Sequence, residues 1–151
     1  VDRIVNCYAA KHLFGSPAMV ISLGTATTFD AISKQGEYVG GAIAPGIKIS
    51  LEALTQRAAL LPPVVIEKPK ELIAKNTLDH MKSGIYYGSL CMIEGMIRRF
   101  RVYLGEHITV IGTGGLSFLF AEEGVFNHHE PDLNLKGLEL IHRHRFHPEM
   151  G

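Results

Sequence analysis

The chain of 151 residues has the length of one ordinary domain and can bury a single hydrophobic core. Its 15 Lys and Arg residues balance its 15 Asp and Glu residues, and the charges are scattered, which argues against a nucleic-acid or anionic-membrane surface and favours a small neutral or anionic metabolite as partner. No stretch approaches the roughly 20 apolar residues that span a bilayer, and the first residues lack the pattern of a signal peptide. We therefore expect a cytoplasmic protein.

Two further features bear on the context of the chain. Cys7 and Cys91 are its only cysteines and lack the spacing of metal ligands, which is typical of free, mostly buried thiols in a reducing compartment. The sequence begins with Val1 instead of Met, and helical periodicity starts almost at once. We expect the chain to be a piece of a longer protein.

A helix pattern and three strand patterns fill the first third of the chain. Apolar residues at helical spacing predict a helix over Ile4–Phe14, ended by a Gly-Ser-Pro sequence. The short, β-branched run Ala18–Leu23 predicts a buried strand. Two more strands are predicted over Phe29–Ser33 and Tyr38–Ala44. Three strands in succession indicate an antiparallel meander.

The rest of the chain is mainly helical by pattern. Three glycines in the longest helix each lower helix propensity by roughly 1 kcal/mol relative to Ala, which indicates close backbone packing there. The order of elements predicts a mixed α/β layer fold. The predicted elements are helices over Ile49–Leu60 with Ser50 as N-cap, Thr77–Arg101 with Thr77 as cap, Leu116–Ala121 and Leu135–His142, and a strand over Ile108–Ile111.

Residues 24–28 (Gly-Thr-Ala-Thr-Thr) place a glycine and three hydroxyls in a predicted turn between strands. Such a turn can offer backbone N–H groups and hydroxyls to phosphate oxygens, with no bulky side chain in the way. An ordinary threonine-rich hairpin turn without a ligand explains the same residues.

Residues 112–115 (Gly-Thr-Gly-Gly) form a second glycine loop, between a predicted strand and a helix. Nucleotides commonly lie against backbone in this setting, although the spacing is that of neither a Rossmann nor a Walker loop. A sharp turn without a ligand is again the alternative. Two such loops in one domain favour a nucleotide cleft, and we expect both loops to face it.

Together with other segments, these loops resemble type III pantothenate kinases in residues and in order. The resemblance reaches to about Ile141. It implies an actin-like ATPase fold of two ribonuclease-H-like halves with a nucleotide cleft between them. Residues 1–151 would be the carboxy-terminal half, and the amino-terminal half, with its Asp-x-Gly-Asn-Thr motif, is absent. The matching segments are Asp2-Arg3, Gly24–Asp30, Gly40–Gly46, Leu61-Pro62, Lys75–Thr77, Ser83-Gly84, Gly88 and Thr113–Gly115.

The resemblance also implies roles for individual residues. Asp2 matches the catalytic aspartate, which accepts the proton of the pantothenate hydroxyl as that hydroxyl attacks the γ-phosphorus of ATP. Arg3 matches the arginine that binds the substrate carboxylate, and Thr77 matches a threonine of the pantothenate pocket. Without the family, an Asp-Arg pair at a helix start is a surface cap. The implied ATP-binding residues are Gly24, Thr25, Thr27, Thr28, Gly114 and Gly115.

Other matching positions are expected to be structural, with one departure. The glycines and proline of residues 40–46 are expected to shape the backbone beside the substrate pocket. Asp30 is expected to be structural, with a place near the cation as the alternative. Ser22 stands where the family usually has Asp, so the metal ligands are unknown. If that aspartate holds a metal or monovalent cation, the site is weakened or rebuilt here.

The leading hypothesis is a kinase that transfers the γ-phosphate of ATP to the primary hydroxyl of pantothenate, the first step of coenzyme A biosynthesis. The resemblance implies Mg²⁺ carried with ATP, a requirement for K⁺ or NH₄⁺, and a homodimer that shares residues across its substrate pocket. This piece alone is expected to be inactive. One alternative, favoured by Ser22, is a non-catalytic relative that binds nucleotide or pantothenate as a regulatory or accessory protein. Another is a different small-metabolite kinase of the same fold.

The histidines near the end of the chain are weaker candidates. His142, His144 and His147 could bind a metal, but arginines lie between them and no carboxylate or cysteine completes a site, which favours a solvated polar tail. His128 and His129 are interpreted in the same way, as part of a loop.

Overall fold

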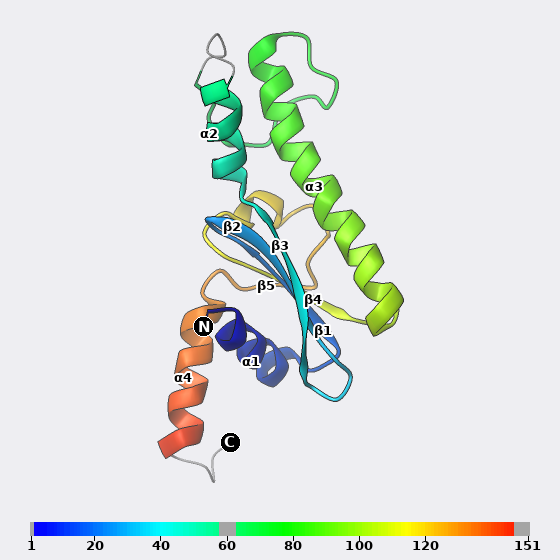
Figure 1. The fold of residues 1–151 in the computed structure, drawn as a ribbon, viewed down its shortest axis with the longest axis vertical. Coiled ribbons are helices and arrows are strands. Elements are labelled where there is room, and N and C mark those ends of the chain that lie inside the picture. The colour runs from blue at the N-terminus through cyan, green and yellow to red at the C-terminus, as the bar shows by residue number, and fades with distance from the viewer. Residues whose placement is uncertain (1, 58–62, 147–151) are drawn as a thin grey trace.

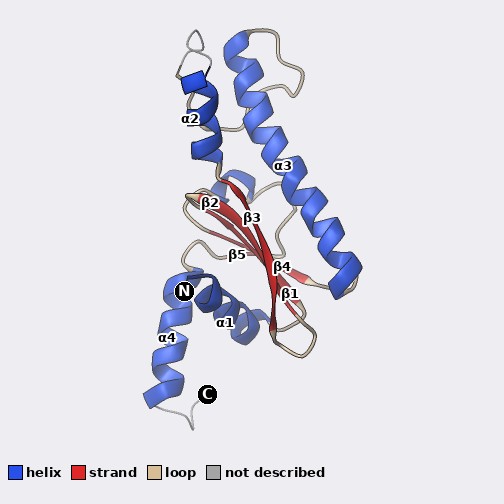
Figure 2. Cartoon of the chain, in the orientation of Figure 1, coloured by secondary structure: helices blue, strands red, loops and turns tan. Residues whose placement is uncertain are grey.

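The computed structural model describes residues 2–57 and 63–146, apart from the side chains at positions 2, 57 and 146. Helices surround a central sheet (Figure 1, Figure 2). No helix within these residues is both long and apolar enough to cross a bilayer. In chain order the elements are α1 (Asp2–Phe14), β1 (Ala18–Leu23), β2 (Ala26–Ile32), β3 (Tyr38–Pro45), α2 (Ile47–Arg57), α3 (Thr77–Leu104), β4 (Thr109–Thr113), the 3-10 helix η1 (Ser117–Phe120), β5 (His128–His129) and α4 (Leu133–Phe146).

The described strands form one sheet with the order β3-β2-β1-β4-β5. β1 pairs antiparallel with β2, and β2 pairs antiparallel with β3, so the predicted meander is confirmed. On its other side β1 pairs in parallel with β4, which in turn pairs in parallel with β5. β1 is therefore hydrogen-bonded on both edges, and most of its residues are buried.

Helices cover both faces of this sheet (Figure 1). Successive residues of a strand point to opposite faces. On one face, Met19, Ile21 and Leu23 of β1 pack in the core cluster that includes α3. On the other face, Ala18 and Val20 pack in the cluster that includes α1 and Leu133 of α4. We call these the α3 face and the α1 face of the sheet.

β2 begins at Ala26 and not, as predicted, at Phe29. The ladder between β1 and β2 continues into the threonine-rich segment, so the turn itself holds only Gly24 and Thr25. Threonine has a high strand propensity as well as a place in turns, and the pattern alone did not separate the two. The threonines at positions 27 and 28 consequently lie in a strand.

α2 begins at Ile47, two residues before the predicted start. Ser50, predicted as its N-cap, lies in its first turn, where its backbone N–H donates to the carbonyl of Gly46 at 2.9 Å. The helix starts directly after the edge strand because Gly46 allows the chain to turn there. The predicted end at Leu60, like Leu61 and Pro62 of the family pattern, lies outside the described residues.

α3 starts at Thr77 as predicted, but Thr77 is not its cap. Asn76 caps the helix, because its side-chain carbonyl accepts the backbone N–H of Asp79 at 2.9 Å. Asn outranks Thr at this position. Within one chain no described residue packs closely on Gly84 or Gly88, since a Cβ added at either would meet nothing within 4 Å, so close packing at these glycines stays a prediction.

The end of the chain is more regular than predicted. His128 and His129, interpreted as a loop, form the short strand β5 beside β4. A two-residue strand has no periodicity of its own, so only its partner defines it. α4 continues through residues predicted as a polar tail, and His144 is hydrogen-bonded to the hydroxyl of Tyr8 on α1. His147 lies outside the described residues.

Gly137 explains how α4 lies so close to α1. A Cβ at this position would lie 2.6 Å from the carbonyl oxygen of Val5 and 3.2 Å from the Cβ of Ala9. Gly137 therefore does not end the helix, as glycine often does. It provides the surface against which α1 packs.

This contact predicts that Gly137→Ala destabilises the protein although alanine favours a helix. The clash with backbone should cost about 1–3 kcal/mol, which exceeds the gain of about 1 kcal/mol in helix propensity. Urea unfolding measures the difference. The matched control is Glu139→Ala on the exposed side of α4, which should change the unfolding free energy by less than about 0.5 kcal/mol. A more stable Gly137→Ala protein would contradict the packing described here.

Candidate active site

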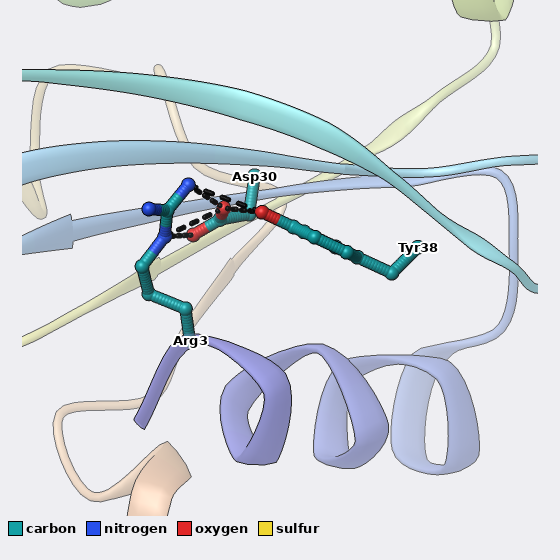
Figure 3. Close-up of polar contacts among 3 residues, drawn as sticks. All are labelled: Arg3, Asp30 and Tyr38. Carbon is teal, nitrogen blue, oxygen red and sulfur yellow. Dashed lines mark hydrogen bonds and ion pairs between the residues drawn. The ribbon is translucent and has the colours of Figure 1, made fainter. Parts of the chain in front are cut away.

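Arg3, in the first turn of α1, forms an ion pair with Asp30 of β2 (Figure 3). Its Nε donates to Asp30 Oδ1 at 3.0 Å, and its Nη2 donates to the same oxygen at 2.7 Å. The hydroxyl of Tyr38, at the start of β3, also donates to Asp30 Oδ1, at 2.9 Å. Three elements, α1, β2 and β3, thus meet at one carboxylate on the α1 face of the sheet.

Burial makes this ion pair the main electrostatic feature of the α1 face. The Asp30 side chain is 2% exposed and that of Arg3 is 34% exposed. The hydrogen bond to Asp30 raises the pKa of Arg3. Burial, and then the hydrogen bond to Asp30, raise the pKa of Tyr38. Arg3 therefore stays charged and Tyr38 stays neutral at neutral pH.

Cys7 lies near this charge and is a buried, unreactive thiol. Burial and then the charge of Asp30 raise its pKa to about 12, against a smaller opposing effect of Arg3. Since the thiolate is the reactive form, Cys7 has no nucleophilic role at neutral pH. Both cysteines are free, as predicted, but Cys91 is exposed and not buried.

A row of hydroxyls crosses the sheet on the α1 face. Ser22 of β1 is paired with Thr28 of β2 on one side and with Thr113 of β4 on the other. Directly paired residues share a face of the sheet, and Asp30 lies two residues beyond Thr28 on that same face. The Thr28 hydroxyl oxygen is buried and has no hydrogen-bond partner among the described residues. Among these polar groups, Asp30 reaches the start of α1 through its contact with Arg3.

The two glycine loops meet at the end of β1, as predicted. The backbone N–H of Leu116 donates to the carbonyl of Leu23 at 2.9 Å. Gly114 has a φ of 97°, and a Cβ there would lie 2.5 Å from the same carbonyl oxygen. Only glycine allows this approach. The loops line one pocket of about 470 Å³, formed by Gly24, Thr25, Lys48, Ile49, Glu52, Gly115 and Leu116.

This pocket leaves room for a ligand against the backbone. A Cβ added at Gly24 or at Gly115 would meet nothing within 4 Å, so both glycines border open space. Phosphate groups bind in such settings because no side chain blocks the N–H groups. The pocket is therefore open at two backbone positions.

Sequence reasoning missed Lys48 and Glu52, which lie in the first turns of α2 and line the pocket. Gly46 places α2 there, because its Cα approaches the turn so closely that a Cβ would lie 2.2 Å from the carbonyl oxygen of Thr25. Exposed charged residues on a helix carry no pattern of their own, so the sequence offered no signal for them.

His129 was also missed as a support of the second glycine loop. The hydroxyl of Ser117 donates to the carbonyl of Gly114 at 2.6 Å, and Nε2 of His129 lies 2.8 Å from that hydroxyl. Ser117 is completely buried. The histidine therefore acts on the loop through Ser117, which only the pairing of β5 with β4 could reveal.

The predicted site residues do not all gather in one place. Thr25 and Gly115 line the pocket, whereas Gly114 lies against β1. Thr27 is 1% exposed and is paired with Leu23, so it belongs to the α3 face. Thr28 points to the α1 face. The side chain of Asp2 lies outside the described residues, although its backbone opens α1 next to Arg3.

Thr77 is far from Arg3 within one chain. The first turn of α3 lies at the opposite end of the molecule from α1 (Figure 1). The glycine-rich segment of residues 40–46 also reaches two separate places. Gly46 lies against the turn at Thr25. Gly40 and Gly41 line a pocket of about 520 Å³ with Phe100 and Tyr103 of α3.

The described residues do not by themselves form a cation site. No group of three or more His, Cys, Asp or Glu side chains among them could hold a metal ion. Ser22 and Thr28 offer hydroxyl oxygens, but the nearest carboxylate on that face, Asp30, is already engaged by Arg3 and Tyr38.

Comparison with known proteins decides the family. Residues 1–99 match the model of the type III pantothenate kinase family. The chain belongs to this family. The type III pantothenate kinase of Thermobifida fusca is 51% identical over 144 residues, which cover 93% of this chain and 56% of the relative. That of Paramagnetospirillum magneticum is 46% identical over 151 residues, which cover 99% and 58%. The chain thus spans a little over half the length of these relatives.

Solved structures confirm the fold. A conserved protein from Campylobacter jejuni, ascribed to the Baf family of transcriptional activators, superposes with a TM-score of 0.66 at 22% identity and covers 98% of this chain and 64% of its own. Component A of (R)-2-hydroxyglutaryl-CoA dehydratase from Acidaminococcus fermentans superposes with a TM-score of 0.50 at 12% identity, with 90% and 64% covered. These likenesses support the expected ribonuclease-H-like half of an actin-like ATPase fold.

The second glycine loop generates a paired prediction. Gly114→Ala should destabilise the protein by about 1–3 kcal/mol from the positive φ alone, with a further cost from the contact with Leu23. Gly115→Ala should leave stability nearly unchanged, because its methyl group enters the open pocket. Urea unfolding of both variants tests the loop geometry. Equal stability of the two variants would contradict it.

Proposed function

We propose that the protein of which this chain forms a part transfers the γ-phosphate of ATP to the primary hydroxyl of pantothenate, the first step of coenzyme A biosynthesis. One observation carries the proposal. The pocket lined by Thr25 and Gly115 lies at the end of β1, and on the neighbouring strand β2 Asp30 holds Arg3, which follows Asp2 in α1. This chain thus combines a pocket open enough for phosphates with an arginine suited to a carboxylate and an aspartate suited to a hydroxyl.

The chemistry proposed for these residues is phosphoryl transfer. The pantothenate oxygen forms a bond to the γ-phosphorus while the bond from that phosphorus to the β,γ-bridging oxygen breaks, and ADP leaves. The hydroxyl proton passes to the carboxylate of Asp2. Because the transition state of such reactions is loose, Asp2 acts mainly by orienting the hydroxyl. Gly24, Thr25 and Gly115 are proposed to hold the phosphates, with Mg²⁺ arriving on ATP.

We further propose that the chain is the carboxy-terminal half of this kinase. Its share of the length of its relatives supports this proposal. The amino-terminal half would supply the other wall of the nucleotide cleft, so the chain alone should be inactive. The requirement for K⁺ or NH₄⁺ is proposed from the family alone. We expect the enzyme to work in the cytoplasm, which suits its two free cysteines.

A homodimer is proposed to complete the substrate pocket. Thr77 is distant from Arg3 within one chain (Figure 1), so a second copy is needed to bring a Thr77 to it. The exposed side of α3 supports such an association, because Gly84 and Gly88 leave room there for another backbone.

The catalytic assignment predicts different effects for two neighbouring residues. In the complete protein, Asp2→Asn should lower kcat by about 10²- to 10⁴-fold with little change in ATP affinity, because the general base is lost. Arg3→Ala should instead raise the KM for pantothenate, since the carboxylate contact exists in ground and transition states alike. Phosphopantothenate formation at saturating K⁺ measures both. Full activity of Asp2→Asn would show that the base is misassigned.

The association predicts that the complete protein is a dimer at micromolar concentration by light scattering. Gly88→Arg, which places a long charged side chain on the exposed side of α3, should yield a monomer. Glu139→Arg on α4 is the matched control and should remain dimeric. A monomeric unmodified protein would overturn the dimer, and a dimeric Gly88→Arg variant would exclude this side of α3 as the interface.

A further inference from the structure

The guanidinium of Arg3 is held along only one of its edges. Arginine has five N–H donors on three nitrogens. Nε and Nη2 both face Asp30, and Nη2 also lies 3.1 Å from the hydroxyl of Tyr38. Among the described residues, none is hydrogen-bonded to Nη1, and Figure 3 shows this nitrogen on the side of the guanidinium away from Asp30. Two N–H groups therefore remain for a ligand.

The carboxylate that holds Arg3 is itself fixed. Asp30 is buried in β2, with Tyr38 donating to it from β3. It is paired across the ladder with Gly41, where a Cβ would lie 2.8 Å from Asp30 Oδ1 and 2.0 Å from the carbonyl oxygen of Phe29. Glycine at this position leaves the space that the carboxylate occupies. The geometry thus fixes the direction in which Arg3 points.

We propose that Asp30 and Tyr38 are positioning residues that present Nη1 of Arg3 to the carboxylate of the acceptor, and so determine the preference for an anionic over a neutral acceptor. This inference rests on the proposed function. A free arginine side chain loses rotamer entropy when it is immobilised. Asp30 removes most of that cost before the substrate binds. It also prevents the fork of Nε and Nη2 from meeting the substrate, so recognition is through the Nη1 end.

A purely structural role for the ion pair would join α1 to the sheet and no more. The two roles differ in one measurable quantity. A structural role alters stability, or all kinetic constants together. A positioning role alters the discrimination between two acceptors that differ only in the carboxylate. Pantothenol provides this comparison with pantothenate, because it carries a hydroxymethyl group in place of the carboxylate.

The experiment measures kcat/KM for both acceptors in the complete protein, and the ratio of the two values reports the discrimination. Asp30→Asn should reduce the ratio about tenfold to a hundredfold, the range expected for a hydrogen bond to a charged group. Tyr38→Phe should reduce it about twofold to tenfold, because it removes one neutral support. The KM for ATP should not change. Tyr38→Phe also decides the question if the Asp30 variant does not fold.

The matched control is Tyr86→Phe. Tyr86 also donates its hydroxyl to a carboxylate, Glu123 at 2.5 Å, but from α3 to the segment after η1. Its loss should affect stability and leave the ratio unchanged. If folded Asp30→Asn and Tyr38→Phe variants keep the wild-type ratio, the positioning role is wrong and the pair is structural. If the wild-type enzyme phosphorylates pantothenate without discriminating, Arg3 does not bind the carboxylate. Absence of phosphorylation of either acceptor by the wild type would overturn the proposed function itself.

Discussion

The pairing of β1 on both of its edges is the constraint on which the rest of the structure depends. An antiparallel neighbour and a parallel neighbour together bring the turn after β1 and the loop after β4 to the same end of the sheet. Parallel pairing requires a long connection, and α2 and α3 lie within it. The contact of Gly114 with the carbonyl of Leu23 follows from this pairing, and the shared pocket follows from that contact. The shared pocket is thus a consequence of strand order.

The second constraint is electrostatic. A buried carboxylate is tolerated only when it is paired and hydrogen-bonded, and Asp30 meets this condition through Arg3 and Tyr38. This requirement links two motifs that are far apart in the sequence. Gly41 is part of the glycine-rich segment of β3, yet it serves the aspartate of the threonine-rich segment by leaving room for its carboxylate. Two segments of the family pattern, Gly24–Asp30 and Gly40–Gly46, therefore meet at a single side chain.

The surroundings of Ser22 explain why serine is tolerated where the family usually has Asp. It lies in a row of hydroxyls with Thr28 and Thr113, on the face that also carries Asp30. A serine adds a neutral group to a region where the only described charges are already paired, so the row remains compatible with the fold.

The sequence alone determined the element types, the antiparallel meander, the meeting of the two glycine loops and the family. These features depend on local periodicity, on the positions of glycines and on short specific motifs, and all three can be recognised in the sequence without knowledge of distant contacts. Tertiary structure alone decided the partner of Arg3, the strand β5, the capping of α3 by Asn76, the approach of α4 to α1 at Gly137, and the entry of Lys48 and Glu52 into the pocket. Each of these features depends on which distant residue lies opposite in the fold. An exposed charge or a two-residue strand shows no periodicity in the sequence, so its partner cannot be predicted from the pattern.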